Sequence, residues 1–182
     1  MKVSLFPNGI QDWEGSVLVI GVFEDEVQRK IQILEKNFKK ELLEERLKQK
    51  KFSGKASQSI AFELFEENLP EKIVFVGLGP PEDLLLDGIR QAATIGSRAS
   101  FGYKGKIGMM FPWDAFESSV VAKEVGEATR LALFKDQRFK SDPEKRLYPD
   151  ELELIGIDRA AKKFLSEISP ICAGVEFARE LV

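Results

Sequence analysis

The segment Lys72 to Gly79, Lys-Ile-Val-Phe-Val-Gly-Leu-Gly, constrains the fold more than any other part of the chain. It is a short run of β-branched and aromatic residues that ends in two glycines, a pattern typical of a strand buried on both faces. A pair of prolines follows, and then a helical pattern of small and apolar residues: Ile89, Ala92, Ala93, Gly96 and Ala99. Strand, loop and helix in this order form half of a βαβ unit, so we predict an α/β domain with this segment as a central strand.

Hydrophobic periodicity predicts further elements on both sides of this strand. Strands are expected at residues 3–6, 16–23, 60–64, 106–111 and 152–157, the first at a sheet edge and the second in the interior. Helices are expected at residues 27–38, 40–50, 115–134 and 159–168, and residues 135–150 are expected to form an exposed loop. A last helix would start with Ser169 as its N-cap and Pro170 at its first position, and run to the end of the chain.

Length and charge limit the classes of protein to which the chain can belong. Its 182 residues are enough for one substantial domain with its own core. A net charge of -3 gives no basic face for nucleic acid, which makes that partner unlikely. No signal peptide and no membrane-spanning run is evident, so we expect a cytoplasmic protein with no membrane partner.

The chain contains no histidine and a single cysteine, Cys172. Ser/His/Asp and Cys/His nucleophile systems need an imidazole, and most zinc sites need histidine or several cysteines, so these sites are excluded in their usual forms. Cys172 has no nearby cationic cluster that would lower its pKa, so we expect a packed thiol and no nucleophile.

Glycine-rich and acidic segments are the remaining candidates for a site. Gly77, Leu78 and Gly79 could begin a dinucleotide fingerprint, but Glu82 stands where the third glycine belongs, so a structural turn is favoured. Gly54-Lys55 and Gly105-Lys106 fail as phosphate loops because the first glycine of that motif is missing from both. Six carboxylates could bind a hard cation, but their positions at helix starts already explain them: Glu24, Asp25, Glu26, Glu82, Asp83 and Asp87.

Several segments, taken in order, resemble the amino-terminal domain of the cytosol (leucyl) aminopeptidases, peptidase family M17. They are Val-Leu-Val-Ile-Gly-Val-Phe-Glu-Asp at 17–25, Phe-Ser-Gly-Lys-Ala-Ser-Gln at 52–58, the strand at 72–79, Arg-Gln-Ala-Ala at 90–93 and Gly-Val-Glu-Phe-Ala-Arg-Glu-Leu-Val at 174–182. The sequence departs from the family at Ser57, where a glycine is usual, and at Asp136 and Gln137, where an aromatic residue and an acid are usual.

The resemblance implies a three-layer α/β/α sandwich with a mixed sheet, macro-domain-like, over residues 1–168. Residues 169–182 would begin a helix that links to a catalytic domain absent from this chain. In the family, that domain holds two divalent metal ions, Mn or Zn, so we expect no catalytic residue, metal ligand or cofactor in residues 1–182. The parent enzyme would be a hexamer that releases amino-terminal residues, often leucine, from peptides.

The first of three hypotheses is that the chain is the non-catalytic amino-terminal domain of such an enzyme. Its last helix ends without a C-cap glycine, which favours a cut chain. Ala173, Phe177 and Leu181, spaced by four, would contact the catalytic domain. The second hypothesis is a freestanding macro-type module that binds a nucleotide-like ligand at the loop that starts at Gly77. The third, a small nucleic-acid accessory, ranks well behind the others.

Overall fold

The computed structural model describes residues 1–34, 40–65, 69–135 and 147–181. Its strands are β1 (Lys2–Phe6), β2 (Val17–Phe23), β3 (Ser59–Glu63), β4 (Lys72–Gly79), β5 (Gly105–Met110) and β6 (Pro149–Ile155). Its α-helices are α1 (Val27–Leu34), α2 (Lys40–Gln49), α3 (Leu86–Ala99), α4 (Ser118–Ala132) and α5 (Leu165–Glu180). Short 3-10 helices lie at η1 (Ile10–Asp12), η2 (Pro81–Asp83) and η3 (Arg159–Phe164).

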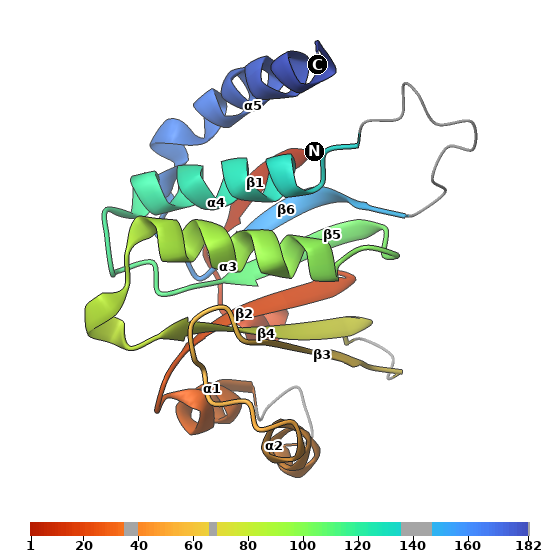
Figure 1. The fold of residues 1–182 in the computed structure, drawn as a ribbon, viewed down its shortest axis with the longest axis vertical. Helices are drawn as coiled ribbons and strands as arrows, with labels where there is room; N and C mark the ends of the chain where they lie inside the picture. The colour runs from red at the N-terminus through yellow and green to blue at the C-terminus, as the bar shows by residue number, and fades with distance from the viewer. Residues whose placement is uncertain (35–39, 66–68, 136–146, 182) are drawn as a thin grey trace.

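The described strands form a six-stranded sheet in the order β1-β6-β5-β2-β4-β3 (Figure 1). Neighbouring strands are parallel except β3, which runs antiparallel to β4. β2 and β4 pair with each other and have a neighbour on their other side, so both predicted interior strands are confirmed. β1 lies at one edge, also as predicted.

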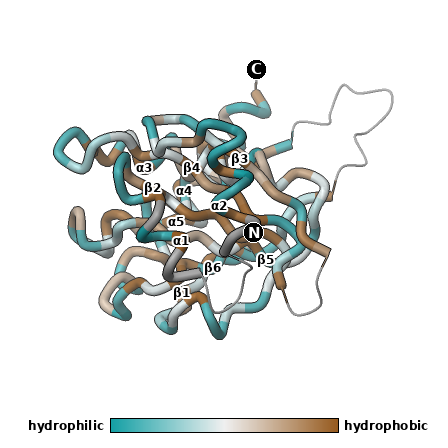
Figure 2. Tube along the Cα trace, turned by 90° about the horizontal axis from the view of Figure 1, so that it is seen from below, coloured by the Kyte–Doolittle hydropathy of each residue, from teal (hydrophilic) through white to brown (hydrophobic). Residues whose placement is uncertain are grey.

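Each face of the sheet has its own hydrophobic core. One core joins the sheet to α3, α4 and η3 through residues such as Val19, Ile89 and Val125. The other joins the opposite face to α1 and α2 through residues such as Ile20, Ile31 and Leu47. Brown, hydrophobic stretches gather toward the middle of the molecule in Figure 2, and teal, hydrophilic ones mark many of the loops at its periphery. The arrangement confirms the predicted three-layer α/β/α sandwich with a mixed sheet.

Small residues bring α3 close to the sheet, as their spacing predicts. Ala92, Ala93 and Gly96 are buried on the inner face of the helix. A Cβ added at Gly96 would lie only 2.4 Å from Cγ1 of Val19 on β2. The glycine therefore sets how closely the helix can approach the central strand.

Two predictions about the last part of the chain were wrong. Residues 159–164 form a 3-10 helix, and α5 begins at Leu165 and continues through Pro170, so Ser169 is not an N-cap. A proline removes one backbone donor, but packing on both sides of it holds α5 continuous. Before it, Ile168 lies against Gly126 of α4, and after it the Cys172 thiol lies 3.9 Å from the Glu127 carbonyl oxygen.

Smaller differences concern element boundaries. β6 begins at Pro149, within the expected loop, because a proline is tolerated at the first position of a strand. The acidic turn at 24–26 precedes α1 as expected, with Asp25 in the left-handed region at φ 65°. The end of the expected helix at 27–38, and Asp136 and Gln137, lie outside the described residues. No helix in the described ranges is long and apolar enough to cross a membrane.

Candidate functional site

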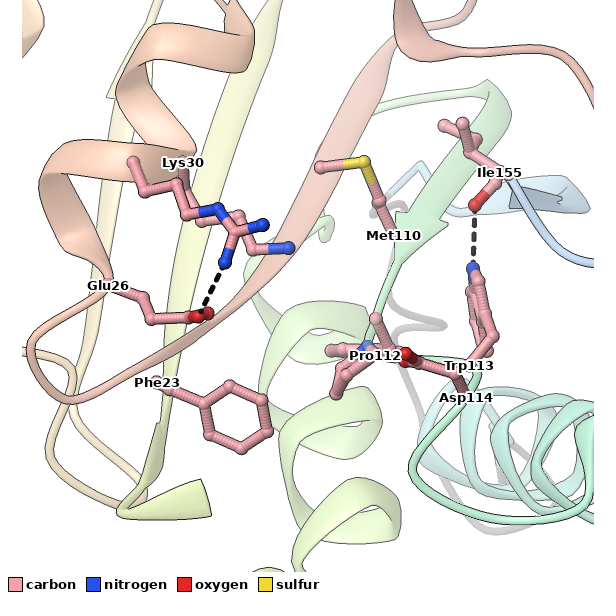
Figure 3. A pocket seen from close by; sticks show the side chains of 11 residues that line it. Phe23, Glu26, Lys30, Met110, Pro112, Trp113, Asp114 and Ile155 are labelled. Carbon is pink, nitrogen blue, oxygen red and sulfur yellow. Dashed lines mark hydrogen bonds and ion pairs between the residues drawn. The ribbon is translucent and has the colours of Figure 1, made fainter.

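A pocket of about 450 Å³ opens where three parallel strands end (Figure 3). Phe23, Met110 and Ile155 are the last residues of β2, β5 and β6, and all three line it. Carboxyl ends of parallel strands meet at one edge of a sheet, where α/β proteins commonly bind ligands. The sequence patterns indicated a possible site after β4 but not this pocket, because none of the ends of β2, β5 and β6 carries a motif. The shared edge of the predicted parallel strands was the available signal.

Four charged side chains line the same pocket. Glu26, Arg29 and Lys30 come from the start of α1, and Asp114 comes from the loop after β5. Arg29 Nη1 donates to Glu26 Oε1 at 3.3 Å. Among the residues that the structure describes, the Lys30 ammonium has no hydrogen-bond acceptor and no ion-pair partner.

Burial lowers the pKa of the Lys30 ammonium, and the nearby Arg29 adds to this effect. The carboxylates of Glu26 and Asp114 act in the opposite direction and raise it. A half-buried ammonium without an acceptor is costly, since desolvation of its charge is not repaid by a hydrogen bond. Lys30 is therefore the polar group in this pocket that is best placed to receive an anionic partner.

The apolar wall of the pocket is fixed in place by its own contacts. The rings of Phe111 and Trp113 pack edge to face, with centroids 5.7 Å apart. Trp113 Nε1 donates to the Ile155 carbonyl oxygen at 2.7 Å, and the indole is only 8% exposed. These contacts hold the wall without any ligand, so the pocket is largely pre-formed.

Gly77, Leu78 and Gly79 lie at the end of β4 and are buried beneath the segment at 54–58. The Gly77 amide donates to the Gln58 carbonyl oxygen at 2.7 Å, and the Gly79 amide donates to that of Gly54 at 2.9 Å. A Cβ added at Gly77 would lie 2.0 Å from the Lys55 carbonyl oxygen. These glycines therefore allow two backbone segments to pack closely, and both of their amides are already hydrogen-bonded within the chain.

The other candidates have structural explanations. Cys172 is buried, and burial raises the pKa of its thiol, which confirms the expected packed thiol. Within the described ranges, no three acidic or cysteine side chains lie together as a cation site would require. The acidic residues at 24–26 and 82–87 are divided between the turn before α1, η2 and the first turn of α3.

The outer surface of α5 is a second candidate site. Ala173, Phe177 and Leu181 are exposed, and the exposed fractions of Phe177 and Leu181 are 61% and 71%. Other exposed apolar positions follow the same helix: Pro170, Ile171, Gly174, Val175 and Ala178. The charged groups of Glu176 and Arg179 turn the other way, onto Arg130 and the Leu131 carbonyl oxygen of α4. A helix that is apolar over its outer face and also packed on its inner one is typical of a buried helix.

Comparison with known proteins places this fold in a class. The structure superposes on a mutant of tomato leucine aminopeptidase with a TM-score of 0.72 and 21% identity, over 100% of this chain and 38% of that one. The bottromycin maturation enzyme BotP gives a TM-score of 0.67 and 16% identity, over 91% of this chain and 32% of its own. The α/β sandwich is therefore the fold found in part of these enzymes.

Sequence comparison identifies the family. Residues 19–143 match the model of the cytosol aminopeptidase family, N-terminal domain. A probable cytosol aminopeptidase of Prochlorococcus marinus is 42% identical over 182 residues, and one of Parasynechococcus marenigrum is 41% identical over 182 residues. The chain belongs to the cytosol aminopeptidase family and corresponds to its amino-terminal domain. Each of these two matches covers 100% of this chain, and the chain spans only 36% of the length of each relative.

Proposed function

We propose that the chain is the non-catalytic amino-terminal domain of a leucyl aminopeptidase, and that the outer face of α5 packs against a catalytic domain. The observation that carries this proposal is the exposed apolar surface of Ala173, Phe177 and Leu181. Monomeric proteins seldom leave large contiguous apolar surface in water, and such patches usually mark an interface. Most of the segment at 169–182, expected to link the two domains, is then the second part of α5, which ends at Glu180.

The parent reaction would be the metal-dependent release of amino-terminal residues, often leucine, from peptides. BotP, which shares the fold, is described in complex with Mn, in line with a Mn or Zn enzyme. The donor set of the described residues fits no two-metal centre, since no three potential ligands converge. Two divalent ions would therefore be held by the catalytic domain, and we assign no residue of this chain to catalysis.

The role of the domain would be assembly and control of access to the active sites, within a cytoplasmic hexamer that acts on peptides. Family membership supports this proposal, because the relatives are more than twice as long as the chain and contain room for a second domain. The apolar outer face of α5 supports it independently, since it supplies a surface for such a domain to cover.

The natural gene product tests the proposal. An antibody raised against the chain should detect a band of more than twice 20.5 kDa in the source cells. Protein purified with that antibody should release leucine from leucine p-nitroanilide, lose this activity to a chelator and regain it with Mn²⁺ or Zn²⁺. The 182-residue chain alone should be inactive. A natural product of the chain's own mass would contradict the proposal.

A further inference from the structure

We propose that the pocket at the ends of β2, β5 and β6 binds a free amino acid with an apolar side chain, in its zwitterionic form. Lys30 would bind its carboxylate and Asp114 its ammonium, while the apolar wall would receive its side chain. The inference goes beyond the proposed function, because it assigns a small-molecule site to a domain with no catalytic group. It stands on the pocket alone, although an aminopeptidase would release ligands of this class.

Lys30 fixes the position of the carboxylate. Its ammonium lines the pocket, is half-buried and has no ion-pair partner among the residues described for this chain. A ligand carboxylate would supply the charge-assisted hydrogen bond that the protein does not. Arg29 is less suited to this role because it is already paired with Glu26 and its side chain is 76% exposed.

The balance of charge favours a zwitterion over a purely anionic ligand. The pocket is lined by two cationic side chains, Arg29 and Lys30, and two anionic ones, Glu26 and Asp114. A diphosphate would place its charges near both carboxylates, and this repulsion would offset much of its attraction to Lys30. An amino acid presents one charge of each sign, which such a pocket can pair. Asp114 is exposed at the rim of the pocket and is available to the ligand ammonium.

Size and shape favour a small ligand with an apolar side chain. A volume of about 450 Å³ lies toward the lower end of the range for small-molecule pockets. Phe23, Met110 and Trp113 offer apolar surface next to the charged groups, as the labelled side chains in Figure 3 show. The contacts that hold Phe111 and Trp113 in place keep this surface rigid, which reduces the entropy lost on binding.

Calorimetric titration of the 182-residue chain with L-leucine tests the inference. Binding is expected with leucine, and at least tenfold weaker binding with 4-methylpentanoate, which lacks the ammonium, and with leucinol, which lacks the carboxylate. Lys30→Met keeps the apolar stem and should weaken leucine binding at least tenfold, while Lys30→Arg should keep most of it. Asp114→Asn should also weaken it. Lys162→Met removes an exposed lysine outside the pocket and should leave the affinity unchanged.

Three outcomes would overturn the inference: no heat with millimolar leucine while circular dichroism shows a folded chain, unchanged affinity in Lys30→Met, or tighter Lys30-dependent binding of ADP-ribose than of leucine. The result is independent of the proposed function. The chain alone contains no catalytic domain, so leucine binding to it cannot arise from a peptidase active site. If leucine does not bind, the predictions for the mass and activity of the natural gene product still stand, because they do not depend on this pocket.

Discussion

Arg130 of α4 and Glu176 of α5 form a two-pronged ion pair, in which the guanidinium Nε and Nη2 each lie 2.8 Å from a different carboxylate oxygen. Their side chains are only 18% and 22% exposed. Arg130 also donates to the Ser169 hydroxyl, 3.1 Å away, about two turns earlier on α5. The pair therefore fixes the rotation of α5, and this rotation leaves Phe177 and Leu181 on the outside.

Breaking this pair should loosen α5. We expect Arg130→Met to lower the free energy of unfolding by about 1 to 2 kcal/mol, because a bidentate, partly buried pair is stronger than a surface pair. Urea denaturation followed by circular dichroism measures this change. Arg29→Met removes a single contact to Glu26 from a side chain that is 76% exposed, and its cost should be below about 0.5 kcal/mol. Equal effects of the two substitutions would refute this view of α5.

The same pair predicts a pH dependence. The hydrogen bonds from Arg130 lower the pKa of Glu176 in the folded chain. A carboxylate with a lowered pKa contributes stability above its unfolded pKa and loses it as pH falls through the folded pKa. The stability difference between the native chain and Glu176→Gln should therefore be full at neutral pH and shrink steadily in acid below the ordinary pKa of glutamate. A difference that grows in acid would have the wrong sign.

Cys172 offers a chemical reporter of α5. Its thiol is buried against α4 and burial raises its pKa, so little reactive thiolate is present at neutral pH. We expect slow reaction with a disulfide reagent such as dithionitrobenzoate in the native chain, and a rate at least tenfold higher in Arg130→Met. Rapid, unchanged labelling in both proteins would show that α5 does not protect this position.

Two glycines of α3 should respond in opposite ways to alanine. At Gly96 the new Cβ would lie 2.4 Å from Val19 Cγ1, and we expect a loss of about 1 to 3 kcal/mol from overpacking. At Gly88 the nearest atom outside the helix backbone is Leu84 Cδ1 at 3.5 Å, an ordinary contact. Gly88→Ala should therefore stabilise the helix by up to about 1 kcal/mol. Thermal unfolding of both variants measures the contrast, and a stabilised Gly96→Ala chain would contradict the packing.

The structure gives a physical reason why a glycine is usual in the family at the position of Ser57. Its φ is 65°, in the left-handed region that favours glycine, and its side chain is exposed. Ser57→Gly should raise the free energy of unfolding by about 0.5 to 1 kcal/mol by relieving this strain. Ser57→Ala keeps a Cβ and should give no gain. Equal stabilities of the glycine and alanine variants would show that the positive φ of Ser57 costs the folded chain no measurable free energy.

The sheet and most helices could be predicted because their patterns are local. β2 and β4 are nearly continuous apolar runs, which only a strand covered on both faces accommodates, and the small residues of α3 predicted its close approach to the sheet. The start of α5 could not be predicted locally. Ser169-Pro170 is a good helix start, but the contacts of Ile168 and Cys172 with α4 outweigh that signal.

The two candidate sites also differ in how far the sequence alone predicts them. The spacing of four predicted that Ala173, Phe177 and Leu181 share one face of a helix, and the structure leaves all three exposed. The pocket did not, because it depends on strands that are distant in sequence ending side by side. Lys30 is an ordinary lysine of an amphipathic helix in sequence, and only the tertiary structure shows that it is half-buried in a pocket that Asp114, more than eighty positions later, also lines.

The measurement that tests the central proposal most directly is hydroxyl-radical footprinting of Phe177, in the 182-residue chain and in the natural gene product. In the isolated chain this ring is 61% exposed and should be oxidised readily. In the natural product a catalytic domain should cover it, and we predict at least fivefold slower oxidation, with Phe65, which is 92% exposed, as an internal reference. Equal oxidation of Phe177 in both proteins would contradict the assignment of α5 as the interdomain surface.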